Sequence, residues 1–163
     1  MKKILLALMA FGAFNTWEVN AAGDGTVCKS IDEAISTGNL TEVIRFVLEE
    51  KVDVNAKRCN YFPLTLAADL GKIDIVRFLC NIGANVEQRT RQFPACSHLS
   101  ELFSDSVPAG FTPIFYAVHN GIDTVKCLVE EFGANPYAKN SVGETPLCYA
   151  AWEGDLILVK ALD

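Results

Sequence analysis

The stretch that decides the fold is Thr112-Pro113-Ile114-Phe115-Tyr116-Ala117, because it returns 33 residues later as Thr145-Pro146-Leu147-Cys148-Tyr149-Ala150. A weaker copy, Phe62-Pro63-Leu64-Thr65-Leu66-Ala67, stands earlier in the chain. Each proline suits the first turn of a helix, where its missing N–H would have no partner inside the helix. The threonine before it in the two stronger copies is a natural N-cap. The repeated stretch therefore predicts the start of the same short helix three times.

Four glycines mark where the first helix of each copy is expected to end: Gly38, Gly71, Gly121 and Gly154. Their spacings are 33, 50 and 33 residues, and each glycine follows an alanine by four positions. A glycine ends a helix well because it takes positive φ without strain. A constant period of this size indicates a chain built from copies of one supersecondary unit. The interval of 50 is that period with 17 residues added.

A second helix is predicted after each framing glycine, since apolar residues recur there at helical spacing, as in Ile73–Leu79. Gly83-Ala84-Asn85 and Gly133-Ala134-Asn135 follow the second helix in two units. This order of turn, Thr-Pro-Leu-type helix, glycine, second helix and Gly-Ala-Asn turn resembles the ankyrin repeat. The resemblance covers about residues 28–163 apart from one insertion. It implies an all-α ankyrin-repeat solenoid that binds protein partners.

The resemblance divides the chain into about four helix–turn–helix units joined by short turns or hairpins, and an insertion interrupts them. The units are placed at about 28–56, 57–89, 110–139 and 140–163, with the insertion at about 90–109, before the third full unit. The first unit lacks Thr-Pro-Leu, and Thr65, Phe115 and Cys148 stand where the family has a histidine.

The insertion contains Ser97, which can cap a short helix through Phe103. Insertions in repeat arrays usually fall on one face, often the binding face. A neutral excursion that is tied down by Cys96 is the alternative, and the sequence leaves both open.

Residues 1–21 have the features of a secretory signal peptide. Met1-Lys2-Lys3 precedes the apolar run Ile4–Phe14, which is too short to span a bilayer. Val19-Asn20-Ala21 is the preferred cleavage site. We therefore expect an exported protein of bacterial type, periplasmic or secreted, with no membrane insertion after cleavage and a mature domain at 22–163. A buried N-terminal helix is the alternative.

Six cysteines in an exported chain favour disulfides. Because neighbouring repeat units lie close enough for bridging, we expect a Cys28–Cys59 bridge, with Cys80–Cys96 as a second pairing. Cys127 and Cys148 replace core-type residues, and buried thiols are the simplest expectation for both.

Charge and motifs argue against several functional classes. The formal net charge of −6 disfavours nucleic acid and anionic membranes as partners. Cys96-Ser97-His98 lacks a second ligand pair at zinc spacing. The sequence contains no phosphate-binding glycine loop, nucleophile elbow or metalloprotease helix. We expect a monomer that is not an enzyme and has no catalytic residue, no cofactor and no metal.

Aromatic residues define the predicted partner-binding surface. The resemblance implies that the residue before each framing alanine, and the two before each framing glycine, line a concave face. Tyr and Trp are over-represented at binding hot spots. The expected partner-binding residues are Tyr116, His119, Tyr149 and Trp152 on that face, Tyr61 and Phe111 at turn tips, and Phe93 and His98 in the insertion. Packing of these rings between units is the alternative.

Protein binding outside the cytoplasm is the expected function, and three versions of it stay open at this point. The first is a resident periplasmic binder or inhibitor, for example an immunity protein against a toxin. The second is a secreted effector that engages a host protein. The third is a stabilising subunit of an envelope complex.

Overall fold

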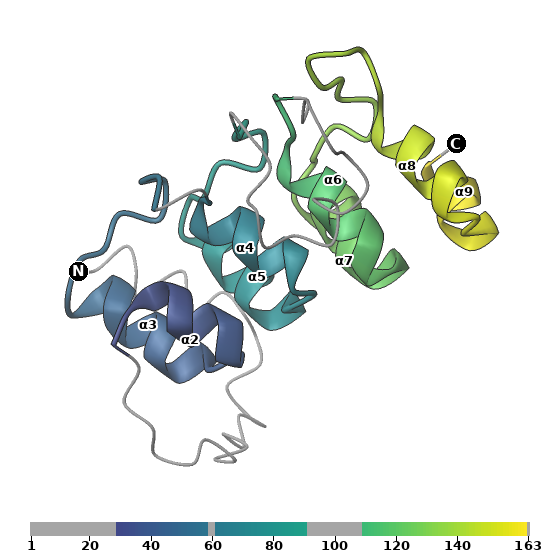
Figure 1. Ribbon diagram of the computed structural model, residues 1–163. Helices are drawn as coiled ribbons and strands as arrows, with labels where there is room; N and C mark the ends of the chain where they lie inside the picture. The colour runs from purple at the N-terminus through teal and green to yellow at the C-terminus, as the bar shows by residue number, and fades with distance from the viewer. Residues whose placement is uncertain (1–28, 59–60, 91–108, 163) are drawn as a thin grey trace.

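The computed structural model describes residues 29–58, 61–90 and 109–162, which form a stack of helix pairs (Figure 1). The helices are α2 (Ile31–Thr37), α3 (Leu40–Leu48), α4 (Pro63–Asp69), α5 (Ile73–Asn81), α6 (Pro113–Ala117), η2 (Val118–Asn120), α7 (Ile122–Lys126), η3 (Cys127–Glu131), α8 (Pro146–Glu153) and α9 (Leu156–Leu162). Figure 1 shows the long connecting loops on one side of the stack and the turns inside each pair on the other. The predicted all-α solenoid of repeated helix pairs is confirmed.

Helices of successive units pack against each other in chain order. The first helices contact one another in the series α2, α4, α6, α8, and the second helices in the series α3, α5, α7, α9. A continuous core runs through all four pairs and includes Ile35, Leu64, Ile114 and Leu158, all fully buried. Each unit alone is too small to bury its apolar face, so the stack is stabilised by contacts between neighbours.

The repeated prolines start their helices as predicted, but the threonines before them do not cap as predicted. Pro113 and Pro146 lie in the first turn of α6 and α8, and Thr112 and Thr145 occupy the N-cap positions. Neither threonine makes a side-chain capping hydrogen bond. Ser30, before α2, does cap its helix, since the Glu33 N–H donates to Ser30 Oγ at 3.1 Å.

The third unit changes register within its second helix. Gly38 and Gly154 take the left-handed conformation, whereas Gly121 has φ 90° and ψ 174°. As a result α7 begins one residue after Gly121, whereas α5 begins two residues after Gly71. The wider π-helical turn η3 absorbs the extra residue, because its hydrogen bonds span one residue more than those of an α-helix.

The insertion leaves and re-enters the stack at a closed neck. The Gly110 N–H donates to the Thr90 carbonyl at 2.7 Å, and the Thr90 N–H donates to the Phe111 carbonyl at 3.0 Å. Arg89 Nη1 donates to the carbonyls of Gly110 at 3.0 Å and of Lys139 at 2.6 Å. The helix pairs on either side therefore stack as neighbours despite the insertion. The short helix expected from Ser97 lies outside the described residues.

The cysteines correct part of the disulfide prediction. Cys80 is a half-buried free thiol in the structure, where it forms no Cys80–Cys96 bridge. Cys127 is buried as expected, but Cys148 is exposed. Phe115 holds the same repeat position as Cys148 and is covered by Tyr149 of the following unit, whereas no described helix lies beyond α8 and α9 to cover Cys148. Cys28, Cys59 and Cys96 lie outside the described residues, so the Cys28–Cys59 bridge stays a prediction.

Candidate functional site

Most of the aromatic side chains predicted to form an exposed patch lie inside the core. Tyr61, Phe111, Tyr116 and Tyr149 are 8%, 0%, 0% and 3% exposed. The prediction that these four residues present a partner-binding surface is therefore wrong, because a partner cannot reach their rings. The alternative, that the rings pack between units, describes them correctly.

The buried rings join units two, three and four through edge-to-face contacts. The Phe111 ring centroid lies 5.1 Å from that of Phe115 and 5.9 Å from that of Tyr149. Tyr61 meets Tyr116 in the same manner at 6.5 Å. Such pairs contribute about 0.5–1.5 kcal/mol beyond the area they bury. The rings are thus part of what holds the stack together.

The two buried tyrosine hydroxyls are hydrogen-bonded, as buried polar groups must be. Tyr116 Oη lies 2.9 Å from Thr90 Oγ1, beside the neck of the insertion. Tyr149 Oη donates to Glu144 Oε2 at 2.8 Å. Burial raises the pKa of both phenols, and at Tyr149 the Glu144 carboxylate raises the pKa further. Both tyrosines are therefore neutral hydrogen-bonding residues of the core.

His119 also connects units and is largely covered, with its side chain 12% exposed. Its Nδ1 contacts the carboxylate of Glu153, so the end of η2 is joined to the end of α8. Trp152, in contrast, is 58% exposed, and it is the one described aromatic residue of the predicted surface that is open to a partner. Phe93 and His98 lie outside the described residues.

A different surface runs along the turns within the helix pairs. We call it the turn edge and define it as residues 36–41, 69–74, 119–124 and 152–157, which contain the framing glycines. In Figure 1 these turns lie on the side of the stack opposite to the long loops.

Successive turns of this edge touch one another. A Cβ on Gly38 would lie 3.5 Å from the Lys72 side chain, and one on Gly71 would lie 3.2 Å from the Asn120 side chain. Asn120 Nδ2 also donates to the Ala68 carbonyl at 3.3 Å, at the end of α4. The contact between His119 and Glu153 continues the series to the fourth unit. The turn edge is therefore one continuous surface rather than four separate turns.

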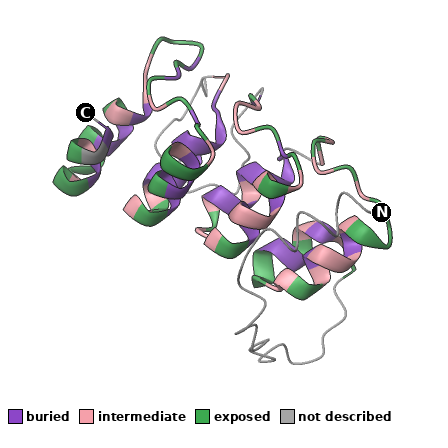
Figure 2. Cartoon of the chain, turned by 180° about the vertical axis from the view of Figure 1, so that it is seen from behind, coloured by how far each residue is buried: buried purple, intermediate pink, exposed green. Residues whose placement is uncertain are grey.

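The fourth unit exposes apolar side chains on this edge. Trp152, Leu156 and Ile157 are 58%, 72% and 68% exposed, and they lie within six residues on the two sides of Gly154. Figure 2 shows how much of the α8–α9 pair, near the C-terminus, is exposed. An exposed apolar cluster of this kind is a mark of an interaction site.

At the places of Trp152 and Ile157 this apolar character is particular to the fourth unit, whereas the place of Leu156 holds half-buried Leu40 and Ile73 in the first two units. The place of Trp152, two residues before the framing glycine, holds Ser36, Asp69 and His119 in the other units. The place of Ile157, three residues after it, holds exposed Thr41 and Asp74 in the first two units. The period of the chain thus does not require an apolar residue at either place. Comparison of the four units at this place indicates Ile157, which a pattern based on aromatic residues alone does not include.

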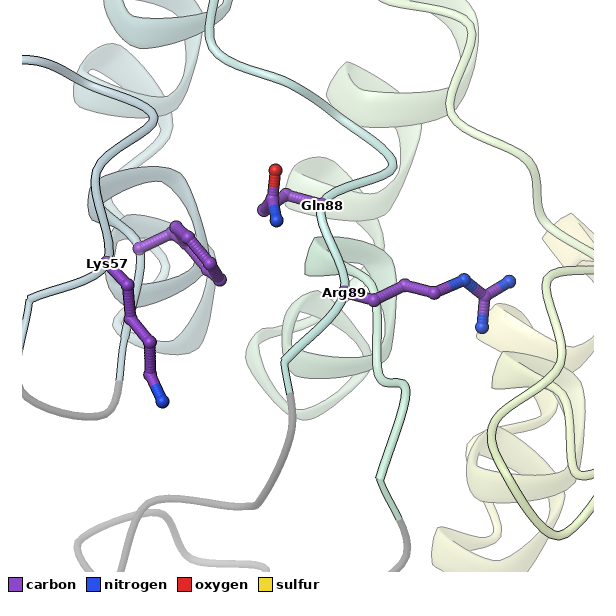
Figure 3. Close-up of a pocket in the computed structure, with 4 residues that line it drawn as sticks. Lys57, Gln88 and Arg89 are labelled. Atoms are coloured by element: carbon purple, nitrogen blue, oxygen red, sulfur yellow. The ribbon is translucent and has the colours of Figure 1, made fainter.

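A cavity lies on the loop side of the stack. It measures about 300 Å³ and is lined by Lys57, Phe62, Gln88 and Arg89 (Figure 3). Arg89 points away from Lys57 in Figure 3, toward the carbonyls that it binds at the neck of the insertion. None of the four described residues that line it supplies a carboxylate, thiol or hydroxyl that could pair with the lysine as acid, base or nucleophile.

Metal and membrane features are also absent from the part of the chain that the structure describes. Within residues 29–58, 61–90 and 109–162, no three His, Cys, Asp or Glu side chains form a group that could hold a metal ion. No helix within the same ranges has the length and apolar character needed to cross a membrane.

Comparison with known families gives two matches. A family model described as ankyrin repeats (3 copies) matches residues 94–162, and one described as ankyrin repeat matches residues 59–91. The two matches together span more than half of the chain. No curated protein sequence matches it.

Proposed function

The chain belongs to the ankyrin-repeat family, and we propose that it is a non-catalytic protein-binding module that docks its partner on the turn edge of the fourth unit. Ankyrin repeats are in general protein–protein interaction modules. Their stacked helices offer extended surfaces to partners. What is particular to this chain is the part of that surface that carries exposed apolar side chains.

The observation that carries the proposal is the exposed cluster of Trp152, Leu156 and Ile157 across one tight turn. Two of these apolar residues replace polar residues of the other units. Full burial of a Leu or Ile side chain is worth about 1.5–3 kcal/mol relative to exposure, so a partner that covers the cluster gains substantial affinity. The turn is held in place by Asp155, whose Oδ1 accepts hydrogen bonds from the N–H groups of Ile157 and Leu158, both at 3.0 Å. A rigid scaffold of this kind lowers the entropic cost of binding.

Site-specific photo-crosslinking in the producing cell tests this function. A photoreactive amino acid at position 157 is expected to give a discrete crosslinked adduct with a partner, and Trp152→Ala is expected to abolish it. The matched control is Tyr137, which is 58% exposed like Trp152 but lies in the loop between η3 and α8. Adducts from position 137 that resist Trp152→Ala, with none from position 157, would contradict the proposal.

Export is a second part of the proposal, and the N-terminal pattern of residues 1–21 supports it. In an extracytoplasmic compartment we propose that the protein binds or inhibits a resident protein, as an immunity-type protein does. Cell fractionation with N-terminal sequencing is the test, and the expected mature N-terminus is Ala22. Recovery from the medium or from host cells would instead favour an effector directed at a host protein. Stable recovery within one envelope complex would favour a structural subunit, and an uncleaved protein in the cytoplasm would contradict export.

A further inference from the structure

We infer that the turn edge recognises a basic amphipathic segment of its partner, with apolar side chains for the cluster of the fourth unit and Lys or Arg side chains for the carboxylates beside it. The inference rests on the proposed function and adds the chemical class of the partner.

The charge of the turn edge is the first observation. The four segments of the edge contain five carboxylates, of Asp69, Asp74, Asp123, Glu153 and Asp155, and one lysine, Lys72. Asp74 and Asp123 are exposed, whereas Glu153 contacts His119 and Lys72 lies partly buried against Gly38. A surface that carries mainly one sign of charge attracts partners of the opposite sign and speeds their association.

The opposite side of the stack lacks this imbalance. The loops at 49–58, 82–90 and 132–145 contain five acidic and five basic side chains. The excess of negative charge is thus larger on the turn edge than on the loop side, and a partner docked on the turn edge lies closest to it. Because the Debye length is about 8 Å at physiological salt, only carboxylates near the contact contribute strongly. Glu153 and Asp155 lie within the apolar cluster, between Trp152 and Leu156, where Glu153 also contacts His119 and Asp155 also accepts hydrogen bonds from backbone N–H groups.

A hollow on the same edge extends the surface toward the first unit. It measures about 300 Å³ and lies between the first two turns, lined by Gly38, Gly71, Lys72, Ile73, Asp74 and Ile75. Leu70, beside Gly71, is a further exposed apolar side chain on the edge. A partner segment that lies along the turn edge therefore meets apolar contacts at both ends, with carboxylates between them.

Electrostatics distinguish this partner from a second copy of the chain. Two copies that met through their turn edges would bring five carboxylates of each into one contact, with one lysine on each side. Like charges opposed across an interface cost several kcal/mol, which disfavours self-association through this edge.

The experiment compares two synthetic amphipathic helical peptides with the same apolar pattern, one of leucine and lysine and one of leucine and glutamate. Trp152 is the only tryptophan of a chain that begins at Ala22, and Trp17→Phe makes it the only one of the full chain, so its fluorescence reports contact directly. We expect a blue shift of the Trp152 emission with the lysine peptide, and an affinity at least about tenfold above that for the glutamate peptide at low salt. Salt is expected to reduce that difference.

Paired substitutions separate the turn edge from general acidity. Asp74→Asn with Asp123→Asn is expected to weaken lysine-peptide binding several-fold, whereas Glu49→Gln with Glu130→Gln, both exposed and away from the edge, changes it little. Equal loss in both pairs, equal affinity for the two peptides, or binding of neither peptide would each overturn the inference. None of these results contradicts the proposal that the partner docks on the apolar cluster of the fourth unit. Only the crosslinking outcome given above would contradict that proposal.

Discussion

Tyr149 and Trp152 lie three residues apart on α8, yet they belong to different surfaces of the molecule. Tyr149 points into the ring cluster between units three and four, where Phe111 and Phe115 cover its ring and Glu144 accepts its hydroxyl hydrogen. Trp152 is exposed on the turn edge. Residue type therefore does not separate stabilising from binding residues in this chain. The direction of the side chain relative to the neighbouring unit does.

The largest expected effect is on the stability of the buried ring cluster. Phe111→Ala is expected to lower the free energy of unfolding by about 3–5 kcal/mol, because it leaves a cavity between fully packed rings. Urea denaturation followed by far-UV circular dichroism measures the change. The matched variant Trp152→Ala is expected to stay within about 0.5 kcal/mol of the parent, since its side chain is exposed. A comparable loss in both variants would remove the distinction between the two surfaces.

A smaller effect is expected from the hydroxyl of Tyr149. Glu144 Oε2 accepts two hydrogen bonds, from Asn140 Nδ2 at 2.8 Å and from Tyr149 Oη at 2.8 Å. Tyr149→Phe keeps the ring contacts but removes the second of these hydrogen bonds. The expected loss of stability is about 1–3 kcal/mol, as for other hydrogen bonds to a charged group. The double variant Tyr149→Phe with Glu144→Gln should recover part of this loss in the same denaturation assay. Additive losses would show that the two groups do not act as a pair.

Replacement of residues 91–108 by a short Gly-Ser linker is expected to change the melting temperature little. The neck of Thr90, Gly110 and Arg89 already holds the ends of the insertion together, and loop closure depends weakly on length, at about 0.6 kcal/mol per doubling. Differential scanning calorimetry measures the change. Arg89→Ala, which removes two hydrogen bonds of the neck, is the comparison and should destabilise more than the loop replacement. The reverse order would mean that the insertion itself stabilises the stack.

The smallest expected difference is in the rates at which individual thiols react. Cys148 is exposed and its pKa is lowered, mainly by the hydrogen bond from Thr145, whereas burial raises the pKa of Cys80 to about 12. Because the thiolate is the reactive form, Cys148 carries more of it than Cys80 at any pH below both pKa values. Alkylation of the native protein, followed by mass spectrometry, should label Cys148 first and Cys80 and Cys127 slowly. Thr145→Val should slow the labelling of Cys148, and equal rates at Cys127 and Cys148 would contradict the burial of Cys127.

Most of the fold follows from local features that the sequence displays. Pro113 and Pro146 fit a helix only in its first turn, so they mark where α6 and α8 begin. Gly38 and Gly154 take a left-handed conformation that other residues adopt at a cost, so they mark where α2 and α8 end. The register change at Gly121 was not predictable, because the glycine keeps its place in the period while the helix after it starts one residue early. The residues around Gly121 do not distinguish it from the framing glycines whose second helix starts two residues later.

The candidate site was predicted only in part, for a related reason. Trp152 is exposed, as the sequence predicts, but Tyr61, Phe111, Tyr116 and Tyr149 are buried, contrary to the prediction. The repeat frame says which residues occupy equivalent positions, and it does not say how far a large ring reaches toward the next unit. In this chain Phe115 stands where the family has a histidine, and the neighbouring rings of Phe111 and Tyr149 pack around it.

The sequence by itself determined the period, the helix pairs, the place of the insertion and the acidity of the turns, because these depend on residues close together in the chain. Only the tertiary structure decided which aromatic rings are buried, which cysteines are exposed and that the successive turns join into one edge. Those outcomes depend on contacts such as Thr90 with Tyr116 or His119 with Glu153, which join residues far apart in the chain and exist only when units stack. Burial in a repeat protein is a property of the interface between units, and the interface forms only when neighbouring units are in place.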